Sequence, residues 1–243
     1  MTLGIIGIVA ALTMPSLIAK HQEKQTVTAL KKFYSSISQA YGLALIENGT
    51  PDTWYKGEVV IGDIEGSNIM VDIITKHMKI SKVCHKNKGC FPDVVYKKID
   101  GKTVVNWNRS QIVSKFLTSD GMSVFFYTYG NRPSINGEGL EKESYGALSV
   151  DINGFKGPNS AGEDLFTFTI TKNGIYPYGT KTSMMKEKLE DGTIVTKNAF
   201  PRMCNRKDCY VNCEACAAWV MYNENMDYLH CDDLSWNGKH KCN

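Results

Sequence analysis

The sequence lacks the features that mark several large classes of protein. No charged residue occurs from Met1 to Ala19, so the basic n-region of a secretory signal peptide is missing. The rest of the chain has no dense run of Lys or Arg and a net charge of only +3. Nucleic-acid-binding proteins carry strongly basic faces, so we expect no nucleic-acid partner.

Catalytic motifs are absent as well. The chain contains no G-x-S-x-G, no H-E-x-x-H and no G-x-x-x-x-G-K-[ST], the patterns of several hydrolase, metalloprotease and nucleotide-binding sites. Its five histidines have no evident nucleophile partner. We therefore expect no catalytic residue, no cofactor-binding residue and no enzymatic activity. The tryptophans could line a binding face, but core positions are commoner for Trp54, Trp107, Trp219 and Trp236.

The chain opens with an apolar run instead. Leu3 to Ala19 is 17 residues long, at the short end of the roughly 17–25 that span a bilayer. Gly4 and Gly7 leave little bulk on one helix face, which lets another helix approach closely. Pro15 predicts a kink, because it removes a backbone donor and clashes with the preceding turn.

The helical pattern continues past this run. Apolar residues recur at spacings of three and four while lysines and glutamines fall between them, which is typical of an amphipathic helix. Neither glycine nor proline interrupts residues 16–41, and Asn48-Gly49-Thr50-Pro51 is a stop signal. We predict one helix of about 45 residues, some 65 Å long at 1.5 Å per residue. Its stripe consists of Val27, Leu30, Tyr34, Ile37, Tyr41 and Ala44.

The segment TLGIIGIVAALTMPSLIAKHQEKQTVTALKKFYSSISQAY resembles the N-terminal helix of type IV pilins and type II secretion pseudopilins. The resemblance covers about the first 45 residues. It implies a pilin-like fold and assembly with other pilin or pseudopilin subunits through this helix. The assembly residues expected on this basis are Leu3, Gly4, Gly7, Pro15, Val27, Leu30, Tyr34, Ile37 and Tyr41.

The resemblance also implies processing and location. In that family a basic leader, a cleavage point for a prepilin peptidase and a methylated first residue precede the apolar helix, so we expect them upstream of Met1. The expected location is the bacterial inner membrane, with a single pass and the head domain outside the cytoplasm, and later a filament. Four lysines follow the apolar run and would favour a cytoplasmic position for that end of the run: Lys20, Lys24, Lys31 and Lys32. Long domains translocate largely regardless of such charges.

Residues 48–243 are predicted to form one α+β head domain, so the domains are 1–47 and 48–243, with a cysteine-rich part at 201–243. Ser67 to Lys79 suits a short helix capped by Ser67. An antiparallel β-sheet is expected, because short turns separate runs rich in β-branched and aromatic residues, and a long N-terminal helix packed on such a sheet is what the resemblance implies. These runs are Thr103–Trp107, Ile112–Leu117, Met122–Tyr129, Tyr145–Ile152 and Leu165–Thr171.

Eight cysteines favour disulfides in an oxidising compartment over a zinc site or a redox C-x-x-C at Cys213 and Cys216. Cys84 and Cys90 enclose a five-residue loop and form the first expected pair. The other six allow 15 pairings, which the sequence leaves open: Cys204, Cys209, Cys213, Cys216, Cys231 and Cys242.

One loop, Asp151 to Phe166, is rich in side-chain oxygens and glycine. Hard cations such as Ca²⁺ prefer oxygen ligands, and some pseudopilins hold calcium in a loop of the sheet region. The expected ligands would be Asp151, Asn153, Asn159 and Asp164. A solvated turn built from Asn, Gly and Pro is the simpler alternative.

Taken together, these features predict a structural subunit of a type IV pilus or type II secretion pseudopilus. The alternative is a membrane-tethered extracellular binding or adhesion domain that does not assemble into filaments.

Overall fold

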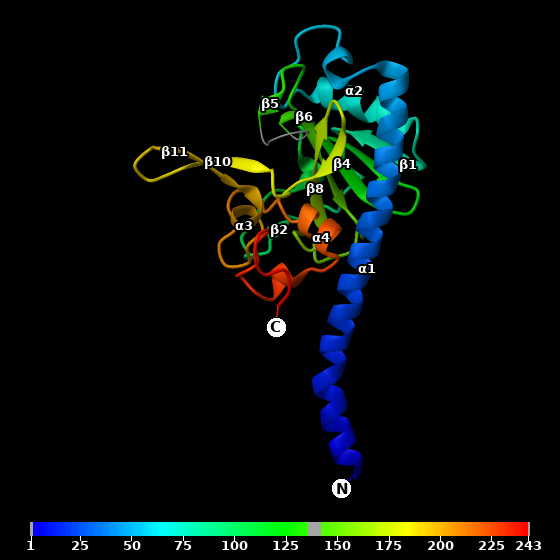
Figure 1. The fold of residues 1–243 in the computed structure, drawn as a ribbon. Helices are drawn as coiled ribbons and strands as arrows, with labels where there is room; N and C mark the ends of the chain where they lie inside the picture. The colour runs from blue at the N-terminus through cyan, green and yellow to red at the C-terminus, as the bar shows by residue number, and fades with distance from the viewer. Residues whose placement is uncertain (1, 136–141, 243) are drawn as a thin grey trace.

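The computed structural model describes residues 2–135 and 142–242, and side chains inside its first helix from Leu17 onward. That helix, α1 (Thr2–Asn48), is continuous through Pro15 and leads into the head, residues 49–242. In Figure 1 the C-terminal part of α1 lies against the head, while its N-terminal part extends clear of it. The predicted helix of about 45 residues is confirmed.

The helix boundaries follow from capping groups. Gly49 ends α1 with φ +77°, and its N–H donates to the carbonyl of Leu45 at 3.0 Å, a left-handed cap that suits glycine. Helix α2 (Ile64–Thr75) begins after Asp63, whose carboxylate accepts from the N–H groups of Glu65 and Gly66. The predicted cap, Ser67, was wrong. Because Asp63 caps the helix earlier, the Ser67 hydroxyl instead donates to the Asp63 carbonyl.

The main sheet of the described residues has nine strands in the order β1-β3-β4-β6-β8-β7-β2, with β5 beside β6 and β9 beside β8. Its strands are β1 (Ile80–His85), β2 (Lys97–Lys98), β3 (Ser114–Thr118), β4 (Ser123–Thr128), β5 (Ser134–Ile135), β6 (Glu143–Asp151), β7 (Ser160–Ala161), β8 (Leu165–Thr171) and β9 (Gly174–Pro177).

The sheet is mixed, so the expectation of a purely antiparallel sheet was wrong. The short strand β7 pairs in parallel with both β2 and β8. A turn at Gly162, with φ +90° and an N–H that donates to Leu165 at 3.0 Å, brings Ala161 beside Leu165 in the same direction. All other pairings are antiparallel in the described strands.

Four of the five predicted strands are present, as β3, β4, β6 and β8, the last with the predicted bounds. The fifth, Thr103–Trp107, was wrong. The chain there runs into a 3₁₀ turn, Trp107–Arg109, because the Asn106 side chain accepts from the Arg109 N–H and turns the backbone.

The core lies on both faces of the sheet. Helices α1 and α2 cover one face, where Val124 and Phe126 of β4 point, and the neighbouring Phe125 points to a second cluster on the other face. This alternation follows from the two-residue period of a strand. The second cluster includes Trp107, which stacks on Phe125 with ring centroids 4.2 Å apart.

The C-terminal part adds a projecting hairpin and two short helices. Strands β10 (Met184–Lys188) and β11 (Ile194–Asn198) pair only with each other and extend from the side of the head away from α1 (Figure 1). Helices α3 (Ala199–Met203) and α4 (Ala217–Asn223) follow. Phe200 and Trp219 stack between them, with ring centroids 4.3 Å apart.

Candidate functional site

The inner face of α1 is bound to the head of its own chain. Tyr34 stacks on Phe168 of β8 with ring centroids 5.6 Å apart, and its hydroxyl donates to the carbonyl of Ile175 at 3.0 Å. The Tyr41 hydroxyl donates to the carbonyl of Thr171. Val27, Leu30 and Ile37 are buried in the same cluster.

These five side chains, expected in contacts between copies, are therefore engaged within the chain. The opposite face of this half of α1 is the one exposed to solvent. There Leu43 is 48% exposed and Ile46 is 81% exposed.

Charged pairs also hold the polar half of α1 to the head. Glu23 lies 2.7 Å from His230, Lys32 lies 2.8 Å from Asp120, and Lys31 pairs with Glu224, the residue that follows α4. Exposed pairs of this kind contribute about 0–1 kcal/mol each. Their effect is to fix the rotation of the helix, which determines the face that it presents to solvent.

The helix leaves the head toward its N-terminus. The side chains from Leu17 to Gln22 are exposed, Leu17 by 69% and Ile18 by 56%. Leu3, Gly4, Gly7 and Pro15 lie outside the described side chains. Over the part of the chain that was described, no helix has the length and apolar character needed to cross a bilayer.

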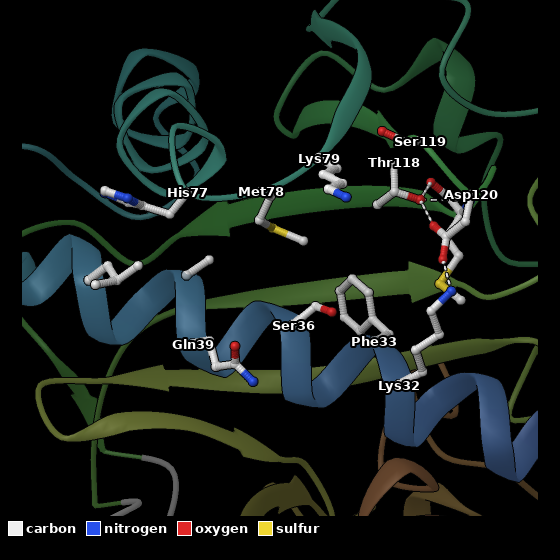
Figure 2. Close-up of a pocket in the computed structure, with 13 residues that line it drawn as sticks. Lys32, Phe33, Ser36, Gln39, His77, Met78, Lys79, Thr118, Ser119 and Asp120 are labelled. Atoms are coloured by element: carbon white, nitrogen blue, oxygen red, sulfur yellow. Dashed lines mark hydrogen bonds and ion pairs between the residues drawn. The ribbon is translucent and has the colours of Figure 1, made fainter.

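A groove of about 490 Å³ runs along the outer side of α1. Its other walls are the segment that joins α2 to β1 and the turn between β3 and β4. Figure 2 shows Phe33 and Met78 facing each other across it, with Lys32 and Asp120 at one end and His77 at the other. Its floor is mostly apolar and its rim mostly polar.

Of the two lysines that line the groove, Lys32 is paired with Asp120 and Lys79 has no ionic partner among the described residues. Partial burial alone would raise the pKa of Asp120, but hydrogen bonds from Lys32 and Thr118 outweigh burial and lower that pKa. Lys79 is exposed and forms no ion pair with any described residue. The rim therefore offers a free ammonium group beside an apolar floor.

The oxygen-rich loop brings its expected ligands together. The buried Asp151 accepts from the N–H groups of Asn153 and Gly154 and from the hydroxyl of Tyr96. The buried Asp164 accepts from the N–H groups of Asn159 and Ser160, each at 2.7 Å, and from the Asn153 amide at 3.2 Å. Burial, and then the charge of Asp164, raise the pKa of Asp151, and burial raises that of Asp164.

Two atoms of this loop have no hydrogen-bond partner. They are the buried Oδ1 atoms of Asn153 and Asn159. Two buried carboxylates beside two unpaired amide oxygens fit a hard cation. No group of three or more His, Cys, Asp or Glu able to hold a metal occurs in the described residues, so a site here would depend on the asparagines. Calcium binding stays a prediction.

All eight cysteines form disulfides. Cys84 pairs with Cys90, as the short loop predicts, and the others pair as Cys204–Cys216, Cys209–Cys213 and Cys231–Cys242. Cys213 and Cys216 thus belong to different disulfides and form no C-x-x-C redox pair. No free thiol remains to bind zinc.

Three side chains are placed like the carboxylate, imidazole and hydroxyl of a hydrolase catalytic triad. The His85 ring lies 3.0 Å from the Ser114 hydroxyl and 3.4 Å from the Asp72 carboxylate. Ser114 is fully buried, so a substrate carbonyl has no access to that hydroxyl. The histidines at 21, 77, 230 and 240 lie elsewhere, with His77 beside Glu47.

The sequence analysis missed the groove and the His85 cluster. The groove residues come from the distant segments 32–43, 77–79 and 118–122, and the cluster joins His85 to Asp72 and Ser114. The packing of helices on the sheet brings such segments together, and no local motif records it. The expectation of core positions for the tryptophans is confirmed for three of the four, since Trp54 and Trp219 are buried in the first cluster and Trp107 in the second. Trp236 is half-buried and packs on Trp219, with ring centroids 5.1 Å apart.

A model described as a family of unknown function (DUF6613) matches residues 16–224. It spans the amphipathic half of α1 and most of the head. No curated protein and no solved structure matches the chain.

Proposed function

The chain belongs to this family of unknown function, and we propose that it is a structural subunit of a type IV pilus or a type II secretion pseudopilus. In this proposal α1 holds the protein in the bacterial inner membrane after processing by a prepilin peptidase. It then packs with α1 of other copies in the core of a filament. The head has a pilin-like fold and faces outward.

The observation that carries the proposal is the division of α1 into two parts. The part from Val27 to Ala44 is buried against the head along one stripe, whereas Leu17 to Gln22 stand clear of it. Leu17 and Ile18 are large apolar side chains exposed on a projecting helix, and the sequence before them is uncharged. Apolar surface of this kind marks a site covered by lipid or by another protein.

Exchange of lipid for a neighbouring helix involves little net hydrophobic gain, so such helices associate through close packing. Gly4 and Gly7 are small residues that would permit it. Four disulfides agree with a head outside the cytoplasm, because disulfides persist in oxidising compartments.

A cross-linking experiment in the native cell tests the proposal. The full-length gene with its upstream sequence is expressed with Ile18→Cys, and membrane and sheared surface fractions are treated with a short bismaleimide. Because all native cysteines are paired, only the engineered thiol reacts. Glu143→Cys, an exposed position on the head, is the matched control.

Each variant chain carries one free thiol and a bismaleimide joins two thiols, so we expect a cross-linked dimer for Ile18→Cys and mostly monomer for the control. We also expect loss of filaments or of secretion in a strain that lacks the gene, seen by electron microscopy and fractionation. A protein that stays monomeric in the membrane, in a deletion strain with unchanged filaments and secretion, would favour a tethered binding or adhesion domain instead.

A further inference from the structure

The hairpin β10–β11, residues 184–198 and here called the arm, has the form of a contact element. Two-stranded hairpins are marginally stable in water without further packing. The arm pairs with no other strand of the described chain and projects from the head (Figure 1).

The base of the arm is firmly held. Met185 is buried with Ala199 and Met203. Glu187 lies 2.8 Å from both Lys197 and Arg202. The arm therefore has a fixed direction relative to the head, which a contact between rigid molecules requires.

The tip of the arm, by contrast, is exposed to solvent. Ile194 is 66% exposed and Leu189 is 38% exposed. Because Lys188 pairs with Ile194, these two apolar side chains lie on opposite faces of the hairpin. Between them Glu190 and Asp191 are exposed and form no ion pair with any described residue. The Asp191 carboxylate accepts from the Thr193 N–H at 2.9 Å. The tip thus combines two exposed apolar side chains with two carboxylates that have no cationic partner among the described residues.

The groove beside α1 has the complementary composition. Its apolar lining includes Phe33 and Met78, and its rim carries Lys79 and the ion pair of Lys32 with Asp120 (Figure 2). Its volume of about 490 Å³ lies in the range of cavities that hold drug-sized ligands. An apolar side chain of a hairpin tip would fit the apolar lining, with a carboxylate next to the unpaired ammonium group of Lys79.

The arm cannot fill the groove of its own chain. It extends from the side of the head away from α1, whereas the groove lies along α1 (Figure 1). A contact between two different surfaces of identical subunits is heterologous, and repetition of such a contact builds an open helical array unless the rotation closes a ring.

We propose that the tip of the arm of one copy docks in the groove beside α1 of the next copy. The occupant is a second copy of this chain. The inference rests on the proposed filament function and gives that function a head-to-head contact, separate from the packing of the N-terminal helices. Glu190 and Asp191 face Lys79, and Ile194 covers Phe33 and Met78.

The test uses full-length chains in the native cell. One tagged copy carries Asp191→Cys and a second, differently tagged copy carries Lys79→Cys, and a short bismaleimide joins thiols that lie close together. The control pair replaces Asp191→Cys with Glu143→Cys. We expect a doubly tagged dimer from the first pair only.

A charge-reversal cycle gives a second measurement. Glu190→Lys with Asp191→Lys should lower the assembled fraction at least tenfold and leave the melting temperature unchanged. Adding Lys79→Glu in the same chain should restore most of the loss. Glu143→Lys serves as the matched control and should assemble like the parent chain.

The outcomes separate the two proposals. If the cross-linked Ile18→Cys dimer forms while the arm and groove thiols do not join and the arm variant assembles normally, the arm contact is wrong and the filament function stands. If the arm thiol joins a different protein, a second copy is not its occupant. If the parent chain forms no multimers, both proposals fall.

Discussion

At the residue scale, Asp151 and Asp164 form a pair of acids whose charged forms are disfavoured by burial. Both carboxylates are buried, and burial followed by the charge of Asp164 raises the pKa of Asp151. A raised pKa in the folded state means that the protonated acid is the better-accommodated form. The pair therefore stabilises the folded protein fully at a pH below 3.8, the ordinary pKa of aspartate. This stabilisation is lost as the pH rises through the higher pKa values that the two acids have in the folded protein.

The first prediction follows from this sign. Chemical denaturation should give a higher unfolding free energy at pH 5 than at pH 7, by about 1–2 kcal/mol, because one pKa unit corresponds to about 1.4 kcal/mol. Asp151→Asn should remove most of that difference, since it keeps the acceptor for Asn153 and Gly154 and removes one charge. An unchanged pH profile in the variant would contradict the assignment to this pair.

The same variant tests the calcium expectation. Calcium bound between the two carboxylates would offset their repulsion at pH 7 and stabilise the fold by about 2.7 kcal/mol at a concentration 100 times Kd. Calorimetry in calcium and in EDTA should then show a shift in the parent chain, in a Lys156→Ala control, and not in Asp151→Asn. Equal melting temperatures in calcium and EDTA would show that the loop binds no calcium and is a simple turn.

At the element scale, α1 presents two faces with different roles. Ile37 is fully buried against the head and Ile46 is 81% exposed on the same helix. We predict that Ile37→Ala lowers the unfolding free energy by about 2–5 kcal/mol, because it leaves a cavity. Ile46→Ala, the same substitution on the other face, should change it by less than about 0.5 kcal/mol. Urea unfolding measures both, and equal losses would contradict the burial of the inner face.

At the scale of the whole molecule, the projecting part of α1 should matter for assembly and not for folding. Leu17→Glu with Ile18→Glu should abolish incorporation into filaments, since charges would have to enter an apolar helical core. The melting temperature of the head should stay within the error of calorimetry, because neither side chain contacts it. Gln22→Glu, a charge added to an exposed position nearby, is the control. Normal assembly of the double variant would contradict a helical core built from this segment.

Local sequence patterns determined the elements that depend on neighbours along the chain. The length of α1 follows from its apolar period and from Gly49, and strand β8 from an unbroken run of β-branched and aromatic residues. The disulfide between Cys84 and Cys90 follows from the short loop that they enclose. The start of α2 was misplaced, because two possible caps, Asp63 and Ser67, stand close together in sequence.

Only the tertiary structure decided which groups from distant segments meet. The packing of α1 against the head brings Lys32, Met78 and Asp120 to one groove, and the fold of the C-terminal part selects one of the 15 pairings left to six cysteines. The parallel pairing of β7 and the direction of the arm are likewise long-range outcomes. Periodicity and capping act over a few residues, whereas these features depend on loop closure and core packing, which no short stretch of sequence contains.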